Sequence, residues 1–166
     1  MKLVVCSDIH DNIWVLKEAL KHMPECDAAL LFCGDFCAPF TLVQLAEGFA
    51  GPIHVIWGNN DGDKWLLTQL AARFPHVELH GELAELELDG RRILANHYPT
   101  IARPLASSGQ ADIVCYGHDH IAFEEVLDNG TLLLNPGELM GRFGKSTYAM
   151  VELDTLALTW VEVQRP

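Results

Sequence analysis

The sequence has few basic residues, and this shortage limits the partners that the protein can bind. Lysine and arginine number 11 against 23 aspartates and glutamates, which gives a formal net charge of −12. Duplex nucleic acids are bound mainly by neutralising their phosphates with lysine and arginine side chains. We therefore expect no duplex nucleic acid among the partners of this protein.

Segments that would direct the chain to a membrane or out of the cell are also missing. The apolar run at residues 1–6 is too short for the core of a signal peptide and lacks a cleavage site. No apolar run approaches the roughly 20 residues that cross a bilayer. We expect a cytoplasmic protein with no membrane partner, and the length of 166 residues predicts one domain over 1–166.

The five cysteines include no C-x-x-C pair, and their odd number does not suggest a disulfide framework. Cys6, Cys33 and Cys115 lie in apolar segments and are predicted to be buried thiols. Cys33 and Cys37 bracket Gly34-Asp35, which leaves a cysteine metal pair open. No second pair completes a tetrahedral zinc site, so this is the weaker interpretation.

The apolar pattern predicts alternating strands and helices first and mostly strands afterwards. The first part has strands at 3–7, 28–33 and 53–57 and helices at 13–22, 40–47 and 64–74. Strands follow at 84–88, 91–96, 113–116, 123–128, 131–135, 147–153 and 158–163, with a helix near 101–108. Asp89-Gly90 is typical of a hairpin turn, and two further turns pair the last four strands. Parallel units followed by hairpins favour two stacked sheets with helices outside, an α/β fold.

Five short groups of metal-binding residue types are spread along the chain, and four of them follow an apolar run. They read Asp8-Ile9-His10, Gly34-Asp35, Gly58-Asn59-Asn60-Asp61, Asn96-His97 and Gly117-His118-Asp119-His120. Ligands of an open parallel sheet bind beyond the carboxyl ends of its strands, so these groups can meet at one edge. Two carboxylates, four imidazoles and an amide are enough to hold two divalent cations, a common arrangement for hydrolysing phosphate esters.

Each group taken alone has a plainer interpretation. A Gly-Asp pair is usually a turn, and the asparagines at 59–60 would form a polar turn before a helix. A single histidine such as His97 is more often a core or surface residue than a ligand. The order of the groups and their repeated placement at strand ends favour one shared site.

This order resembles the calcineurin-like metallophosphoesterase superfamily, which is marked by D-x-H, G-D, G-N-[HNC]-[DE], a histidine and G-H-x-H. The resemblance covers residues 8–120, and the small size resembles the compact bacterial and archaeal phosphodiesterase branch. That branch also contains the retromer small subunit, a scaffold protein. The resemblance implies a four-layer α-β-β-α sandwich of two packed mixed sheets flanked by helices.

The resemblance also implies two metal sites that share Asp35. One would use Asp8, His10, Asp35 and His120, and the other Asp35, Asn59, His97 and His118. The expected cofactors are two divalent transition metal ions, with manganese first and nickel, iron, zinc or cobalt also suited to these ligands. The implied function is hydrolysis of phosphodiester bonds in small phosphate esters, by direct attack of a hydroxide that bridges the metals. The cations would offset the acidic charge locally and attract a phosphate.

The chain departs from the family pattern at two places. Larger members carry a histidine after Gly-Asn, where it protonates the leaving group, and this chain has Asn60. An amide does not serve as a general acid, a role that contributes roughly 10²–10⁴-fold, so we expect weaker catalysis or a preference for good leaving groups. We assign Asn60 to a phosphate contact and Asp61 to orienting a ligand or its loop. The family often has His-Gly-His where this chain has Asn96-His97-Tyr98.

Other functions remain open at this point. One is a non-catalytic protein-interaction scaffold of the same fold, although the chain keeps every expected ligand. Another is a nucleotide or dinucleotide polyphosphate hydrolase. The sequence also allows a homo-oligomer, because Trp65 or Phe143 would mark a dimer surface if exposed, while core packing explains both equally well.

Overall fold

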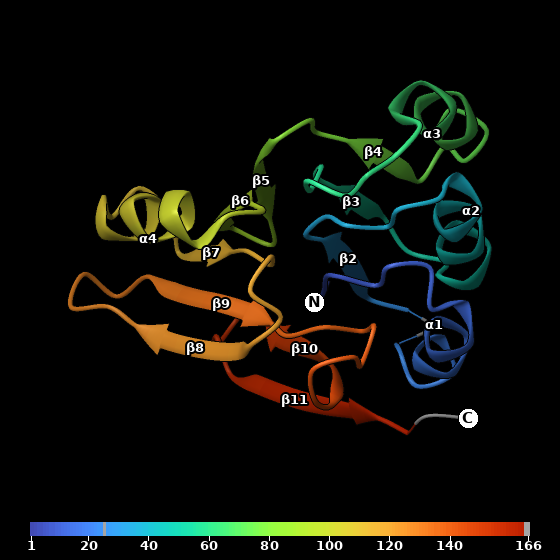
Figure 1. The fold of residues 1–166 in the computed structure, drawn as a ribbon. Helices are drawn as coiled ribbons and strands as arrows, with labels where there is room; N and C mark the ends of the chain where they lie inside the picture. The colour runs from blue at the N-terminus through green and yellow to red at the C-terminus, as the bar shows by residue number, and fades with distance from the viewer. Residues whose placement is uncertain (25, 165–166) are drawn as a thin grey trace.

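Two β-sheets pack face to face, and helices cover the outer face of each sheet (Figure 1). The structure is a computed structural model that describes residues 1–24 and 26–164. On one side lie α1 (Ile13–Leu20), α2 (Pro39–Gly48) and α3 (Lys64–Ala71), and on the other side lies α4 (Pro99–Ser107). This arrangement confirms the predicted four-layer sandwich of two mixed sheets.

The first sheet has the strand order β11-β10-β1-β2-β3-β4. Its strands are β1 (Lys2–Cys6), β2 (Ala28–Phe32), β3 (Ile53–Val55), β4 (Val77–Leu79), β10 (Ser146–Glu152) and β11 (Leu158–Val163). Strands β1 to β4 run parallel, while β10 pairs antiparallel with β1 and with β11. The carboxyl ends of β1, β2 and β3 therefore lie at one edge of the sheet.

The second sheet has the order β5-β6-β7-β9-β8. Its strands are β5 (Leu83–Leu88), β6 (Arg91–Asn96), β7 (Ile113–Cys115), β8 (Ala122–Val126) and β9 (Leu132–Pro136). The central strands β6, β7 and β9 are parallel, and each edge strand is antiparallel to its neighbour. The predicted hairpins at Asp89-Gly90 and in the last four strands are confirmed.

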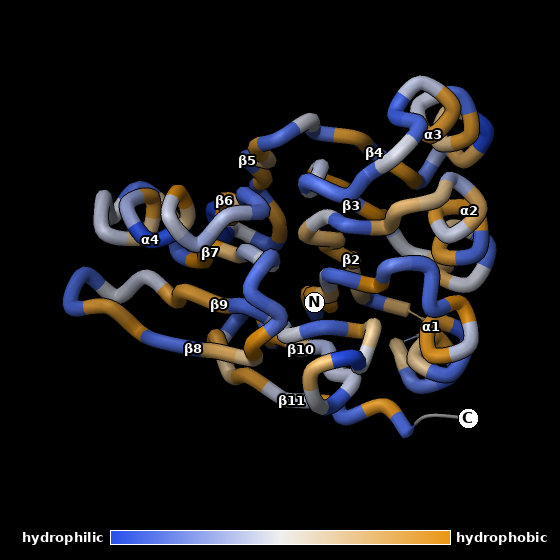
Figure 2. The backbone as a smooth tube through the Cα atoms, in the orientation of Figure 1, coloured by the Kyte–Doolittle hydropathy of each residue, from blue (hydrophilic) through white to orange (hydrophobic). Residues whose placement is uncertain are grey.

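Alternating side chains of each strand divide the apolar residues among three cores. In β1, Val4 packs towards α1 to α3, while Leu3 and Val5 pack between the two sheets. A third core joins the second sheet to α4. Full burial of one such side chain contributes about 1.5–3 kcal/mol, so the three cores together hold the four layers against one another. Figure 2 shows that hydrophobic and hydrophilic residues also alternate along the helices.

The structure differs from the sequence expectations at several element ends and in three further respects. The short strand β4 was not predicted, because three residues are too few to show a strand pattern. Helix α3 ends at Ala71 rather than at Phe74, where i to i−3 hydrogen bonds replace the helical ones. The core interpretation of Trp65 and Phe143 is wrong, because these residues are 73% and 69% exposed. Among the described residues, no helix is both long and apolar enough to cross a membrane.

Candidate metal centre

The loops that follow five parallel strands bring the predicted ligands together. Asp8 and His10 follow β1, Asp35 follows β2, Asn59 follows β3, His97 follows β6, and His118 and His120 follow β7. These strands belong to both sheets, so the centre lies where the two sheets meet. All seven residues therefore lie shortly after the end of a strand, where the sequence predicted them.

Asp8, His10 and His120 form the first cluster, with ligand-type atoms within 4.8 Å of one another. Nε2 of His120 lies 3.3 Å from Oδ1 of Asp8, and Nε2 of His10 lies 3.7 Å from the same oxygen. Nε2 of His10 is also 3.5 Å from Oδ2 of Asp35. The rings of His10 and His120 are stacked, with their centroids 5.1 Å apart.

The second cluster lies around Asp35, a residue that also contacts His10 of the first cluster. Nε2 of His97 lies 3.5 Å from Oδ2 of Asp35. Oδ1 of Asn59 lies 3.1 Å from Nε2 of His97 and 2.9 Å from Nδ1 of His118. The amide oxygen of Asn59 and both imidazoles thus meet beside the Asp35 carboxylate.

Three of the imidazoles are oriented by a partner at Nδ1. The Cys33 carbonyl lies 2.7 Å from Nδ1 of His97, and Oε2 of Glu138 lies 2.8 Å from Nδ1 of His120. The Cys37 sulfur lies 3.4 Å from Nδ1 of His10. A carbonyl or carboxylate at Nδ1 holds the proton there and leaves the lone pair of Nε2 for a metal.

The centre contains polar atoms whose hydrogen-bonding capacity the protein does not satisfy. Oδ1 of Asp8 and Nε2 of His10 are buried without a hydrogen-bond partner, although such atoms are nearly always paired in proteins. Ligands of one transition metal ion, each about 2.1 Å from it, lie roughly 3–3.5 Å apart, which is close to the spacings of these clusters. The residues therefore fit divalent cations in both chemistry and spacing.

Electrostatics keep the shared carboxylate charged. Burial alone would raise the pKa of Asp35, but hydrogen bonds from His97 and Asn60 outweigh burial and lower the pKa well below its ordinary value. The contact with Asp8 raises the pKa of His10, and burial acts in the opposite direction. A cation that binds His10 must therefore displace any proton on that ring, so metal binding and proton release are coupled.

Most of the predicted ligands have an unusual backbone conformation. Asp8, His10, Asp35, His118 and His120 have positive φ angles, between 41° and 75°. Such left-handed conformations cost about 1–3 kcal/mol each in non-glycine residues and are concentrated at functional sites. The surrounding fold must offset this cost, which indicates that the positions of these side chains matter more than local stability.

Two residues of the third group, Asn60 and Asp61, hold the loops of the centre together. The Asp61 carboxylate is buried and accepts the backbone N–H groups of Gly58, Phe36 and Asp35 at 2.6, 2.7 and 3.2 Å. Asn60 donates its backbone and side-chain N–H groups to the two oxygens of Asp35, at 2.7 and 2.8 Å. Asp61 thus occupies the position expected of a residue that orients ligand loops, and Asn60 lies directly on the shared carboxylate.

Sequence reasoning missed Glu138, which lies beyond β9, at the same edge of the second sheet as His97 and His118. Its carboxylate is buried, with one oxygen at His120 and the other accepting the backbone N–H of Phe143 at 2.6 Å. The Phe143 ring lies edge-on to the His120 ring, with centroids 5.2 Å apart. The signal in the sequence was a polar, ligand-type residue shortly after an apolar strand, as in four of the five groups.

The cysteine alternative receives no support. Cys6, Cys33 and Cys115 are buried, as predicted. Among the described residues, no cysteine belongs to a cluster of three side chains spaced to hold a metal.

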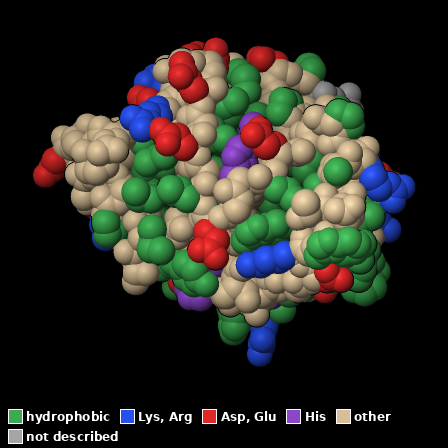
Figure 3. Space-filling view, turned by 90° about the horizontal axis from the view of Figure 1, so that it is seen from above, with side chains coloured by type: hydrophobic (Ala, Val, Ile, Leu, Met, Phe, Trp, Pro, Cys, Tyr) green, Lys and Arg blue, Asp and Glu red, His purple; other side chains and the backbone are tan. Residues whose placement is uncertain are grey.

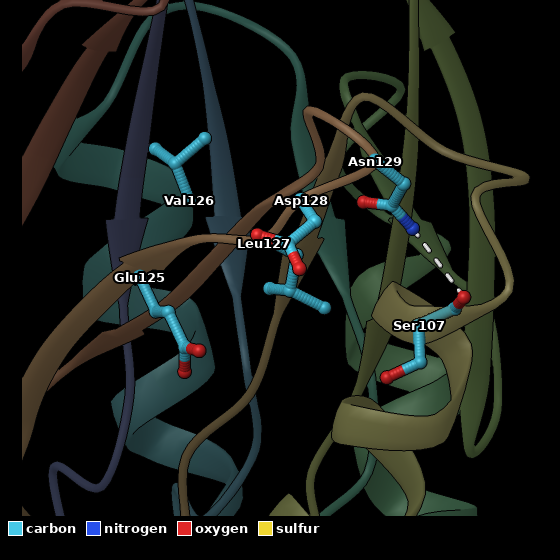
Figure 4. A pocket seen from close by; sticks show the side chains of 6 residues that line it. All are labelled: Ser107, Glu125, Val126, Leu127, Asp128 and Asn129. Carbon is cyan, nitrogen blue, oxygen red and sulfur yellow. Dashed lines mark hydrogen bonds between the residues drawn. The ribbon is translucent and has the colours of Figure 1, made fainter.

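A separate shallow hollow, between α4 and the β8–β9 turn, shares no residue with the centre (Figure 4).

Known proteins resemble this chain in sequence. Residues 1–156 match the family model of the calcineurin-like phosphoesterase superfamily domain. Phosphodiesterase MJ0936 of Methanocaldococcus jannaschii is 30% identical over 145 residues, which cover 85% of this chain and 86% of that protein. The probable metallophosphoesterase YsnB of Bacillus subtilis is 30% identical over 169 residues, which cover 96% and 88%.

Solved structures show the same fold at lower sequence identity. An archaeal phosphodiesterase has a TM-score of 0.90 and 24% identity, covering 98% of this chain and 100% of the other. Vps29 of Entamoeba histolytica has a TM-score of 0.69 and 17% identity, covering 99% and 100%. The family and the curated relatives support a metal-dependent phosphoesterase. This chain belongs to the calcineurin-like phosphoesterase superfamily.

Proposed function

We propose that this protein is a dinuclear metal-dependent phosphodiesterase that acts on small phosphate esters. The observation that carries the proposal is the position of Asp35. Its Oδ2 lies 3.5 Å from Nε2 of His10 and 3.5 Å from Nε2 of His97, so one carboxylate is within ligand spacing of imidazoles from two clusters. A carboxylate shared by two imidazole clusters is what a pair of neighbouring cations requires.

The proposed ligand sets are those that the family resemblance implies. Asp8, His10, Asp35 and His120 would hold one ion, and Asp35, Asn59, His97 and His118 the other. When bound, two divalent cations acidify a water molecule, polarise the phosphoryl oxygens and stabilise the charge that develops during displacement. Imidazole, carboxylate and amide ligands suit manganese, which we propose as the first ion to test.

Differences in exposure define the side from which a substrate enters. Asp8, Asp35 and His97 are buried, whereas Asn59, Asn60 and His118 are exposed. A phosphate ester therefore approaches across the asparagines. Asn60 holds Oδ2 of Asp35 through its side-chain N–H at 2.8 Å, and this places an amide donor where phosphoryl oxygens would arrive. We propose that Asn60 positions the phosphoryl group by hydrogen bonding.

Asn60 stands where larger family members have a histidine, so no imidazole at this position can donate a proton to the leaving group. General acid catalysis contributes about 10²–10⁴-fold when the leaving group is a poor one, because the departing alkoxide then needs a proton. Aryl esters leave as stable phenolates and depend less on this proton. We therefore expect aryl phosphodiesters to be cleaved faster than alkyl phosphodiesters.

A metal-dependent activity screen tests the proposal. Protein stripped of metal and then loaded with manganese, zinc, cobalt or nickel is assayed on aryl phosphodiesters, aryl phosphomonoesters and cyclic nucleotides. We expect diester hydrolysis that requires added metal. The variants Asp35→Asn and His120→Ala should fall to the rate of the metal-free protein, because each removes a ligand.

The matched control is His22→Ala, which removes an exposed imidazole that, among the described residues, pairs with Glu18 of α1 alone. Its activity should equal that of the wild type. Fully metallated protein that hydrolyses neither monoesters nor diesters would overturn the proposal and leave the scaffold interpretation as the better one. If activity survived in Asp35→Asn, catalysis would not depend on a carboxylate shared by two ions.

A further inference from the structure

A second group of metal-binding side chains lies outside the centre and shares no residue with it. It consists of His54 in β3, Glu78 in β4 and His80, which directly follows β4. Nδ1 of His54 lies 3.0 Å from Nε2 of His80. Oε2 of Glu78 lies 3.6 Å from the former atom and 3.8 Å from the latter. We call these three residues the His54 cluster.

The strand register explains why these side chains meet. β3 and β4 pair in parallel, with His54 aligned to Glu78, and His80 lies two residues further along the chain. Successive side chains of a strand point to opposite faces, so residues two apart share a face. The neighbours Ile53, Val55, Val77 and Leu79 pack into the core beneath α1 to α3, which directs the His54 cluster to the opposite face.

The position of β4 makes this polar group accessible from solvent. β4 is the edge strand of the first sheet. The His54 side chain is largely buried, whereas the Glu78 side chain is 68% exposed, so the cluster runs from the protein interior to the surface. Figure 3 views the side on which α3 and β4 lie in Figure 1, and it shows histidine surface next to acidic side chains near the middle of that face.

Two further observations favour a ligand here. Nε2 of His54 is buried without a hydrogen-bond partner, so no protein group at that nitrogen fixes the tautomer of the ring, and Nδ1, which faces Nε2 of His80 at 3.0 Å, can carry the lone pair. Burial lowers the pKa of both His54 and His80, with Glu78 acting in the opposite direction on each. A lower pKa favours the neutral ring, which is the form that binds metals.

We propose that the His54 cluster is a separate mononuclear site for a divalent transition metal ion of the zinc class. The three ligand atoms are 3.0, 3.6 and 3.8 Å apart. Ligands about 2.1 Å from a tetrahedral zinc ion lie roughly 3.4 Å apart, so the observed spacing needs only small side-chain movements. Two imidazoles and one carboxylate leave a fourth position for water. The ion would join β3 to the edge strand β4 and so stabilise the pairing of this three-residue strand.

Zinc stoichiometry tests the proposal directly. Full-length protein is stripped of metal, equilibrated with excess zinc, freed of unbound ion by dialysis and analysed for bound zinc per chain. Glu78→Gln and His80→Ala each remove one ligand on or beside the exposed edge strand, and we expect each variant to hold about one zinc ion fewer than the wild type. The control His22→Ala removes an exposed histidine that has a single glutamate neighbour, and it should bind as much zinc as the wild type.

Cobalt separates this site from the dinuclear centre. In an Asp35→Asn background the shared carboxylate of the centre is lost, yet the His54 cluster remains complete. Cobalt added to that protein should give the intense visible absorption of a tetrahedral ion, and Glu78→Gln in the same background should lose it. Failure of the phosphodiesterase proposal would leave this result unchanged, because no enzyme activity is measured.

The effect on the edge strand gives a readout that a hydrogen-bonded histidine pair without an ion would not produce. Zinc should slow hydrogen exchange of the β4 amides in the wild type by at least about tenfold and leave exchange unchanged in His80→Ala. Equal zinc content in the wild type, Glu78→Gln and His80→Ala would overturn the proposal. If zinc did not change hydrogen exchange of the β4 amides in the wild type, the ion would not stabilise the pairing of β4 with β3.

Discussion

The carboxylate of Asp61 joins the two loops that carry Asp35 and Asn59, and its replacement tests how the centre is held. Oδ2 accepts the backbone N–H groups of Gly58 at 2.6 Å and of Asp35 at 3.2 Å, while Oδ1 accepts that of Phe36 at 2.7 Å. The variant Asp61→Asn keeps the shape of the side chain. It replaces one acceptor oxygen by an NH₂ group and removes the negative charge.

The expected loss follows from these three hydrogen bonds. Each bond to a charged acceptor contributes about 1.5–3 kcal/mol. If the asparagine oxygen stays on the N–H groups of Gly58 and Asp35, its NH₂ group faces the Phe36 N–H, and that bond is lost. The other two bonds weaken because the acceptor is now neutral. We expect the free energy of unfolding to fall by about 2–4 kcal/mol. For a chain of this size that lowers Tm by roughly 4–16 °C.

Metal affinity should fall as well, because Asp61 orients the loops of two ligands. Loss of such an orienting residue typically lowers metal affinity about 10–100-fold. Thermal denaturation of the metal-free protein measures the stability loss, and calorimetric titration with manganese measures the affinity. Separating the two readouts shows whether the carboxylate supports the fold, the metal centre or both.

The matched control is Asp63→Asn, the same chemical change two residues away. Asp63 is exposed and caps α3 by accepting the backbone N–H of Leu66 at 2.9 Å. Aspartate and asparagine are about equally good caps, so its stability should stay within about 0.5 kcal/mol of the wild type. If Asp61→Asn unfolds at the same temperature as Asp63→Asn and binds manganese like the wild type, the reasoning is refuted.

Three further changes should affect the same centre. In Gly58→Ala, the added Cβ would overlap Oδ1 of Asp35, and we expect manganese affinity, measured by calorimetry, to fall at least about tenfold. Glu138→Gln replaces the carboxylate at Nδ1 of His120, and we expect the affinity to fall about 10–100-fold in the same titration. Asn60→His introduces an imidazole that can protonate a leaving group, and kcat/KM for alkyl diesters should rise more than that for aryl diesters, by up to about 10²–10⁴-fold.

Each of these changes has an outcome that contradicts it. Gly144→Ala serves as the glycine control, because its added Cβ would meet no atom within 4 Å, and it should bind manganese like the wild type. Equal affinity of Gly58→Ala and Gly144→Ala would show that the loop yields to the added methyl group. Unchanged affinity in Glu138→Gln would mean that this carboxylate does not orient its histidine. Equal changes for alkyl and aryl esters in Asn60→His would exclude a role in leaving-group protonation.

Most strands and turns could be predicted because short stretches of the sequence carry their pattern. Strands such as 28–33 are continuous apolar runs, as expected where both faces of a strand are covered, and residues 28–32 form a buried strand. Asp89-Gly90 has the chemistry of a tight turn, and its flanking strands pair as a hairpin. Strand β4 escaped prediction because pairing with β3, rather than its own three residues, makes it a strand.

The sequence by itself determined which residues are of metal-binding types and where they stand relative to strand ends. Residue type and order are read directly from the chain, so Asp8, Asp35 and Asn59 could be named from the sequence alone. Asp61 could be given an orienting role for the same reason, because it lies within one of those groups. The family resemblance then grouped the ligands around two ions.

Only the tertiary structure decided what surrounds these residues. Glu138 meets His120 through a contact between the segment after β9 and the loop after β7, and no local pattern encodes that pairing. The His54 cluster likewise exists only because β3 and β4 pair in one register, which aligns His54 with Glu78. Local sequence sets which elements form and which groups are reactive. The packing of distant strands sets which of those groups share one site, because close contacts between them depend on register and on which face each side chain occupies.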